Sequence, residues 1–169
     1  DATPEEVAKA AFGEENRTRL IKRYFRGSES EPFQIVSQRN AWLHIYRLLD
    51  FGWHDPTVCV WVAVLPNGRE IAFQEYSQVR TPAQVIAREL KSVSSDWRII
   101  TTLADPTIWS GEKEMGHSIA DEFENAGVPL TRAKNDRVAA GFAIQEHLNQ
   151  TLADGLPKLQ IYEPGCPTL

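Results

Sequence analysis

The sequence predicts an α/β fold, a mixed β-sheet with helices on both of its faces. Two observations carry this prediction. Three apolar segments between residues 44 and 76 are separated by turn signals, which indicates antiparallel strands. From residue 81 onward, helical periodicity alternates with short apolar runs, as in helices that cross over a sheet. A chain of 169 residues, 42% of them hydrophobic, is long enough for one domain with a packed core.

Residues 1–40 are predicted to form a helical and linker segment ahead of the core. Thr3 is a suitable N-cap, Pro4 suits the first helical position and Glu6 completes a capping box. A helix is therefore expected to run from here to about residue 25.

The core, residues 41–169, is expected to begin with a meander of strands. Strands are predicted over residues 44–50, 57–65 and 70–76. Asn67-Gly68 between the second and third strands is the strongest short-range signal for a hairpin turn.

Helices and strands then alternate to the end of the chain. The predicted order is a helix from a Thr81-Pro82 cap to 93, a strand at 98–103, a helix at 115–126, a strand at 128–130, a helix at 136–152 and a strand at 159–162. Gly127 is expected to end the second of these helices.

Composition narrows the possible functions. A net charge of −5 argues against a protein that passively coats nucleic acid, but not against an enzyme whose acidic site binds a metal first. No apolar run approaches the roughly 18 residues that span a membrane, and no secretory signal is visible. Because the sequence starts without Met, we expect a fragment or a trimmed chain. With two cysteines, and Cys59 in an apolar run, we expect a reducing, intracellular setting without disulfides.

Two aspartates that close apolar strands are the strongest functional signal. Asp50 ends the first predicted strand and Asp105 follows the fourth. Aspartate is depleted in strands, and at the edge of a core it is costly unless it is paired or bound to a cation. If these strands are adjacent and parallel, both carboxylates reach the sheet edge where α/β proteins bind ligands, in a site suited to Mg²⁺ or Mn²⁺. Trp53 and Trp109, which follow the two acids, are expected to pack in the core.

The layout resembles the ribonuclease H-like fold, and short motifs narrow the resemblance. They are Leu49-Asp50-Phe51-Gly52-Trp53-His54-Asp55-Pro56 with Trp61, Ala104-Asp105-Pro106 with Trp109, Gly127, Lys134-Asn135-Asp136-Arg137, Gly141, and Ile161-Tyr162 with Cys166-Pro167. Their order and spacing resemble the nuclease domain of the large terminase subunit of tailed bacteriophages, over about residues 45–169.

This resemblance implies an endonuclease that cuts concatemeric double-stranded viral DNA during genome packaging, in the cytoplasm of the infected bacterial host. It makes Asp50 and Asp105 the first two catalytic acids, which hold Mg²⁺ or Mn²⁺ in a two-metal site. The third acid of the family lies in an Asp-His-x-x-Asp segment, expected here beyond Leu169. The implied partners are double-stranded DNA, an ATPase domain of the same polypeptide, the small terminase subunit and the portal, with no membrane.

Four further residues in these motifs each have two interpretations. Asp136 reads as a helix N-cap or as an additional metal ligand. Lys134 and Arg137 contact DNA phosphates or form a solvated helix end. His54 contacts a phosphate or a metal-bound water, or it is simply an exposed loop residue.

Other functions stay open at this point. A junction resolvase of the same fold would prefer branched to linear DNA. A non-catalytic module that binds DNA or packaging partners would keep its binding when Asp50 is replaced by Asn, and would show no metal site. An actin-like nucleotide-binding domain shares the strand order but needs a duplicated half and phosphate loops, which this sequence lacks.

Overall fold

The computed structural model describes residues 44–95, 97–110, 117–134, 136–162 and 165–169, with the backbone of two short strands at 25–26 and 34–35. In chain order the elements are β1 (Phe25–Arg26), β2 (Gln34–Ile35), β3 (His44–Asp50), β4 (Thr57–Val64), β5 (Glu70–Gln78), α3 (Ala83–Val93), β6 (Ile99–Ala104), the 3₁₀ helix η2 (Pro106–Trp109), α5 (Ile119–Asn125), β7 (Thr131–Arg132), α6 (Arg137–Asn149) and β8 (Leu159–Ile161).

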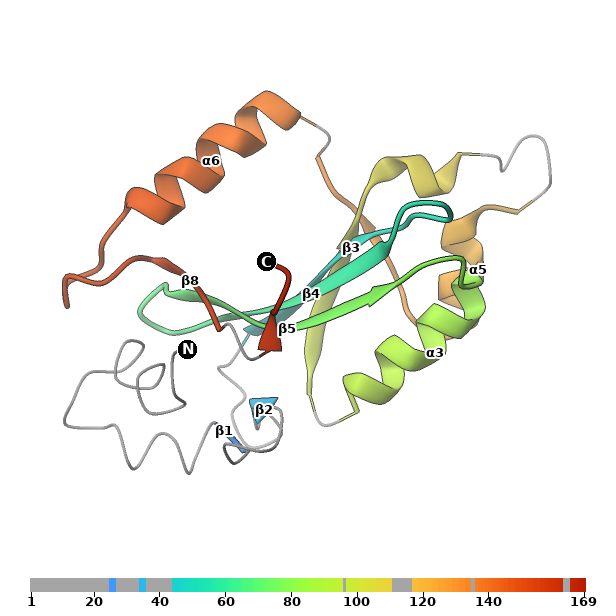
Figure 1. Cartoon of the computed structure of the whole chain (residues 1–169), viewed down its shortest axis with the longest axis horizontal. Coiled ribbons are helices and arrows are strands. Elements are labelled where there is room, and N and C mark those ends of the chain that lie inside the picture. Colours follow the sequence, from blue (N-terminus) through green and yellow to red (C-terminus); the bar gives the residue numbers. More distant parts are fainter. Residues whose placement is uncertain are drawn as a thin grey trace.

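A six-stranded mixed sheet, ordered β7-β6-β3-β4-β5-β8, forms the centre of the molecule. β3, β4 and β5 form the predicted antiparallel meander, and β6 runs parallel beside β3. β7 and β8 extend the sheet in parallel at its two edges, while β1 and β2 pair separately. Helices α3 and α5 lie on one side of the sheet and α6 on the other (Figure 1). The predicted fold class is therefore confirmed.

The turn between β4 and β5 is the one that Asn67-Gly68 predicted. The Leu65 N–H donates to the Arg69 carbonyl at 2.8 Å, and the Gly68 N–H donates to the Leu65 carbonyl at 2.9 Å. Gly68 has a φ of 83°, a conformation that glycine adopts without the penalty of a Cβ atom. The tight turn fixes the register of the hairpin.

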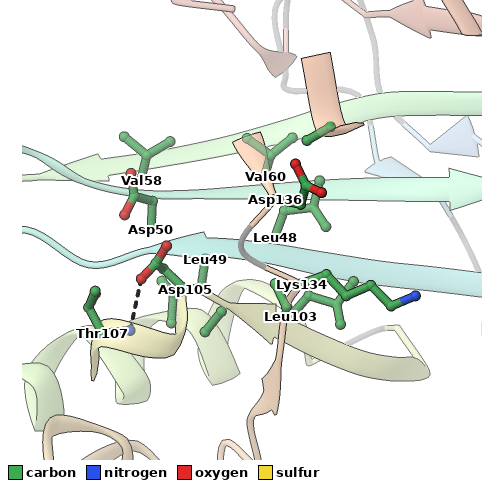
Figure 2. A pocket seen from close by; sticks show the side chains of 13 residues that line it. Leu48, Leu49, Asp50, Val58, Val60, Leu103, Asp105, Thr107, Lys134 and Asp136 are labelled. Atoms are coloured by element: carbon green, nitrogen blue, oxygen red, sulfur yellow. Dashed lines mark hydrogen bonds between the residues drawn. The ribbon is translucent and has the colours of Figure 1, made fainter. Parts of the chain in front are cut away.

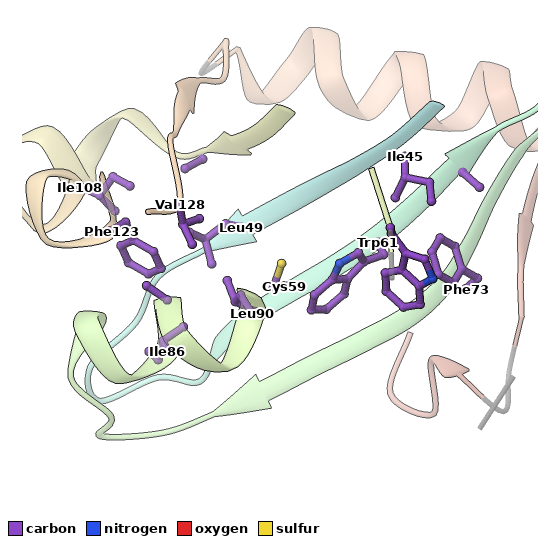
Figure 3. Packing of buried hydrophobic residues seen from close by; sticks show 14 of the residues in the cluster. Ile45, Leu49, Cys59, Trp61, Phe73, Ile86, Leu90, Ile108, Phe123 and Val128 are labelled. Carbon is purple, nitrogen blue, oxygen red and sulfur yellow. The ribbon is translucent and has the colours of Figure 1, made fainter. Parts of the chain in front are cut away.

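The main core lies between the sheet and the layer of α3 and α5. Alternate residues of β3 and β4 point into it, and Ile86, Leu90 and Phe123 come from the helices (Figure 3). Trp97 packs edge-on against the rings of Trp61 and Phe73, with centroids 6.2 and 5.0 Å apart. Burial of large aromatic and aliphatic side chains of this kind is the main favourable term in folding.

The opposite face of the sheet is only partly covered. Leu48 of β3 is 43% exposed, and Phe142 of α6 is 69% exposed although α6 lies on this side. Every α6 side chain that the structure describes is exposed, except the half-buried His147. Helix α6 therefore does not pack closely on the sheet, in contrast to α3.

Polar contacts hold the C-terminal end of α6 and the loop after it. His147 Nδ1 lies 2.9 Å from Glu70 Oε2 at the start of β5, and Lys158 Nζ lies 3.6 Å from the other oxygen of Glu70. In the following loop, Arg69 Nη2 donates to both carboxylate oxygens of Asp154, at 2.7 and 2.8 Å. These contacts anchor α6 to the hairpin between β4 and β5.

Two predicted elements differ in their bounds from those of the structure. The strand predicted at 128–130 is wrong, because β7 is Thr131–Arg132. The Val128 N–H donates to the Phe123 carbonyl at 2.9 Å, so it cannot pair with a neighbouring strand. Pro129 has no N–H to donate to a neighbouring strand. The helix predicted from Asp136 to 152 ends at Asn149, ahead of a turn in which Gly155 has a φ of 78°.

Helix starts also differ from expectation. Thr81 does not cap α3: its hydroxyl donates to the Val79 carbonyl at 3.0 Å, and Pro82 is the N-cap. Helix α5 begins after a Ser118–Asp121 capping box, a signal that the sequence carries and that our prediction overlooked. Residues 111–116, where that helix was expected to start, lie outside the described residues.

Most of the predicted N-terminal segment, residues 1–40, lies outside the described residues, including its helix as far as residue 24. Phe25, which was expected at the end of that helix, belongs to β1 instead. Among the described residues, no helix combines the length and the apolar character that crossing a membrane requires.

Both cysteines are free and buried, as the expected lack of disulfides requires. Cys59 lies in the main core, and Cys166 packs on Val60 and Ala72 at the other face of the sheet. Burial raises the pKa of each thiol to about 12. Because the thiolate is the reactive form, these side chains are structural.

The first prediction concerns Arg69, which is fully buried and has no hydrogen-bond partner for Nε or Nη1 among the described residues. Replacing Asp154 by Asn leaves this buried charge without its carboxylate. We expect a loss of about 2 kcal/mol in the free energy of unfolding, below the full penalty for a buried pair because the Asp154 side chain is 33% exposed. Urea denaturation measures the loss.

The same variant has a defined pH dependence. Burial opposes ionisation of Asp154, but hydrogen bonds from the Leu156 backbone and from Arg69 outweigh it and lower its pKa. Its contribution is therefore present above the ordinary pKa of about 3.9 and is lost as the pH falls through the lower folded value. Asp55→Asn, at an exposed aspartate, is the control. Equal losses in both variants at pH 7 would contradict the prediction.

Candidate functional site

The pairing of β3 with β6 brings the two predicted acids together. Leu49 is the register partner of Ala104 in this parallel pair. Asp50 is the last residue of β3 and Asp105 directly follows β6, so both reach the same sheet edge at matched positions. Both lie on the open face of the sheet, and Figure 2 shows their carboxylates near each other at one end of a pocket. The expected side-by-side placement is therefore what the structure has.

The pocket lies between the open face of the sheet and the start of α6, with a volume of about 790 Å³. Its lining residues are Leu48, Leu49, Asp50, Val58, Val60, Leu103, Ala104, Asp105, Thr107, Ala133, Lys134, Asp136 and Ala140. The floor is mostly apolar, and the charged groups stand at its rim. A cavity of this size with few polar groups is typical of a ligand site.

A buried hydrogen bond on the other face of the sheet supports the register. Arg47 Nε donates to Thr102 Oγ1 at 2.9 Å, and both residues are almost fully buried. Ser94 at the end of α3 accepts from Arg47 Nη1 at 3.5 Å and from Trp61 Nε1 at 2.9 Å. Burial lowers the pKa of the Arg47 guanidinium from its ordinary value. This network links β3, β6 and α3 beneath the pocket.

The loop that follows Asp50 is folded tightly. The buried Thr57 hydroxyl donates to the Gly52 carbonyl at 2.8 Å and accepts from the Gly52 N–H at 3.2 Å. A Cβ atom on Gly52 would lie 2.5 Å from the Asp55 carbonyl oxygen, which real contacts do not allow. Glycine at this position therefore lets the chain turn directly behind the first acid.

Asp105 has a structural contact as well as its place in the pocket. Its Oδ1 accepts from the Thr107 N–H at 2.8 Å, which caps η2. Such a bond limits rotation of the carboxylate. The turn-starting role of Asp-Pro and a ligand role are compatible here, because a carboxylate has two oxygens.

The other predicted site residues divide into three cases. Asp136 lines the pocket and caps α6, with Oδ1 accepting from the Ala139 N–H at 2.9 Å. Lys134 also lines the pocket, and Figure 2 shows its amine directed away from the two acids. His54 is exposed in its loop and is not among the lining residues. The Arg137 side chain lies outside the described part of the structure.

The two tryptophans behave differently from each other. Trp53 is 49% exposed, so the expected core position is wrong for this residue. Its loop instead uses the Trp53 carbonyl, which accepts from the Arg80 N–H at 3.1 Å. Trp109 packs against the core and carries the Arg132 guanidinium over its ring, 4.9 Å from the centroid.

The resemblance implies a divalent metal, which oxygen ligands at this edge would have to hold. Among the described residues, no group of three or more His, Cys, Asp and Glu side chains is close enough to hold one ion. Two carboxylates at one edge nevertheless suit Mg²⁺, which usually keeps several waters and is held by one or two carboxylates together with substrate phosphates. Asp50 and Asp105 therefore fit this ion as an open site.

Comparison with solved structures places the fold. Two crystal structures of the large terminase from the thermophilic bacteriophage D6E superpose with a TM-score of 0.58, at 17 and 18% identity. They match 74 and 72% of this chain and 30 and 29% of the phage protein. A weaker match, with a TM-score of 0.49 and 17% identity, covers 70% of this chain and 58% of the large terminase nuclease from the thermophilic phage G20c.

No protein-family model and no curated protein matches the sequence. At these identities the superpositions establish the fold: a ribonuclease H-like mixed sheet of the kind found in large terminases. The resemblance predicted from the motifs is confirmed at this level. The chain spans less than a third of the length of the D6E protein.

The second prediction tests the register lock. Thr102→Val keeps the side-chain shape but removes the acceptor for Arg47 Nε, leaving a buried donor unpaired. We expect a loss of about 2 kcal/mol in the free energy of unfolding. Thr101→Val is the matched control, because that hydroxyl pairs with Thr131 at an exposed position and should cost under about 0.5 kcal/mol. Equal losses in urea denaturation would show that the bond has no special role.

Proposed function

We propose that this chain is the nuclease part of a phage large terminase, a divalent-metal-dependent endonuclease that cuts concatemeric double-stranded viral DNA during packaging. The observation that supports this proposal most strongly is the matched placement of Asp50 and Asp105 at the ends of parallel strands. The fold shared with the D6E large terminase adds support.

In this proposal, Asp50 and Asp105 hold Mg²⁺ or Mn²⁺ in a two-metal site and face the scissile phosphate. When bound, such ions would lower the pKa of a water molecule and offset the negative charge that develops on the leaving oxygen. The β3 and β6 ends keep the carboxylates in position, and the Asp105–Thr107 bond limits rotation of one of them. A further acidic ligand would complete the site, and Asp136 and a segment beyond Leu169 are the two candidates.

The proposed substrate contacts are mainly to phosphates. Lys134 at the pocket rim, Arg137 and the loop residue His54 would bind the DNA backbone, which carries no sequence information directly. Binding should therefore depend steeply on salt. In the whole protein, which would act in the cytoplasm of the infected bacterium, the proposed partners are the ATPase domain of the same polypeptide, the small terminase subunit and the portal.

The third prediction is the direct test of activity. Supercoiled plasmid is incubated with the chain in Mn²⁺, Mg²⁺ or EDTA, alongside Asp50→Asn and Asp105→Asn. We expect metal-dependent nicking and linearisation that falls at least about a hundredfold in each variant, because ligand loss removes several kcal/mol of transition-state stabilisation. Asp55→Asn, outside the pocket, should cut like the unmodified chain.

The outcomes of this assay separate the competing functions. Cleavage that survives Asp50→Asn would contradict the assigned site. Preferential cutting of branched over linear DNA would favour a junction resolvase. If the chain binds DNA but does not cut it with either metal, and an extension that carries a further acidic segment beyond Leu169 does not restore cutting, the enzymatic proposal fails and a docking module is left. Thermal unfolding of each variant shows whether the loss reflects chemistry rather than misfolding.

The fourth prediction separates the two interpretations of Asp136. Asp136→Ser keeps an N-cap oxygen but removes the carboxylate, whereas Asp136→Ala removes both. Because the structure shows the cap directly, we expect Asp136→Ser to keep stability and to cut within about threefold of the unmodified chain. Asp136→Ala should lose about 1 kcal/mol of stability. A large loss of cleavage in a stable Asp136→Ser variant would identify Asp136 as a ligand instead.

A further inference from the structure

We propose that helix α6 is a lid, which closes onto the apolar floor of the pocket and restricts access to Asp50 and Asp105 until DNA displaces it. The closure follows from the contacts and exposures of α6 and the sheet. Its effect on DNA access rests, in addition, on the nuclease function proposed above.

The floor of the pocket is apolar, which DNA does not require. It includes Leu48 of β3, Val58 and Val60 of β4 and Leu103 of β6. Leu48 is the register partner of both Val60 and Leu103, so these three side chains form a row on one face of the sheet. Leu48 is 43% exposed. Because the DNA backbone is bound through charged and polar groups, this row is better matched to an apolar cover.

One side of α6 faces this floor, across the sheet from α3 and α5 (Figure 1). Asp136 and Ala140 line the pocket, and His147 reaches Glu70 on β5. Their spacing of four and seven residues puts them along one side of the helix, the inner side. Ile144, four residues after Ala140, shares it and is 55% exposed. The inner side therefore presents apolar groups to the floor, while both surfaces remain in contact with solvent.

Helix α6 is held near its two ends rather than along its length. Ahead of it, the Ala133 N–H donates to the Ala104 carbonyl at 2.9 Å, which ties the chain to the end of β6. At its far end, His147 Nδ1 lies 2.9 Å from Glu70 Oε2, and His147 Nε2 lies 3.3 Å from Lys158 Nζ. Between these points every described α6 side chain is exposed. The helix can therefore approach the sheet without withdrawing a buried side chain from elsewhere.

Closure is favourable because it removes apolar surface from water on both sides of the pocket. The competing interpretation is a fixed wall, which leaves the floor permanently open to solvent. The two interpretations differ in how accessible the Leu48 position is in solution.

The test is the rate at which a maleimide labels Leu48→Cys in the 169-residue chain. Cys59 and Cys166 are buried, and burial raises the pKa of each thiol to about 12, so the unmodified chain is the blank. Val93→Cys is the reference, because Val93 ends α3 on the other side of the sheet and is 39% exposed. Each rate is divided by that of the same variant unfolded in urea. A fixed wall gives similar ratios, whereas we expect labelling of Leu48→Cys to be about tenfold slower, as for a lid closed about nine-tenths of the time.

Two substitutions on α6 show whether α6 itself is the cover. Ile144→Asn places an amide on the inner side, where closure would bury it without a partner, so labelling of Leu48→Cys should rise to the reference rate. Phe142→Asn is the matched control, because Phe142 follows Ala140 by two residues and so lies about 200° around the helix, on its outer side. Phe142 is 69% exposed, and its replacement should leave labelling slow.

Other covers would give different results in the same assay. Slow labelling that Ile144→Asn does not release would assign the cover to another segment and overturn the lid. Slow labelling that becomes faster on dilution of the protein would assign it to a second copy of the chain, which also overturns the lid. Thermal unfolding of each variant shows whether a faster rate reflects loss of the fold.

Plasmid cleavage tests the consequence for the nuclease separately. A lid closed about nine-tenths of the time raises the DNA concentration for half-maximal cutting about tenfold. Ile144→Asn should therefore lower that concentration by up to about tenfold relative to Phe142→Asn, with the same maximal rate. Released labelling without this shift would overturn the role of α6 in DNA access. If the chain does not cut at all, the nuclease function fails, while the labelling rates still decide whether α6 closes.

Discussion

The parallel register of β3 and β6 is the constraint on which the site depends. Side chains alternate between the two faces of a strand, so a slip of one residue would turn one carboxylate into the main core, where an unpaired charge is very costly. Arg47 and Thr102 lie three residues before Asp50 and Asp105, on the buried face, and their hydrogen bond joins the same two strands. A polar contact inside the core thus sets the alignment of an acidic pair outside it.

A buried arginine is an expensive way to stabilise a sheet, since the desolvation of its charge offsets most of what its hydrogen bonds contribute. Its value here is specificity of pairing. Among the described residues, the Arg47 guanidinium donates to Thr102 and to Ser94, which converge on it. Ser94 belongs to the end of α3 and also accepts from Trp61 in β4. The network therefore fixes one arrangement of two strands and a helix, where apolar contacts alone would tolerate several.

Apolar alternation and Asn67-Gly68 were enough to predict the strands of the meander. That Asp50 and Asp105 would lie side by side followed from their positions at strand ends only if the two strands were adjacent and parallel, which the structure has. Three other features could not be predicted from local sequence patterns. The Arg47–Thr102 bond joins residues 55 positions apart, and nothing near either residue announces its partner. β7 starts later than its apolar residues suggest, because Pro129 has no N–H to pair. Trp53 looked like a core residue by type, but its loop lies at the surface.

The two walls of the pocket, the sheet and the start of α6, are stabilised by different interactions. Its floor is the sheet, where main-chain ladders and a close-packed core keep Asp50 and Asp105 rigid. Its opposite wall is the start of α6, whose described side chains make little apolar contact with the sheet and whose far end is anchored through His147 and Glu70. Segments with few buried contacts open at low free energy. The two aspartates thus sit on the more rigid element, while the width of the pocket depends on the element that is easiest to displace.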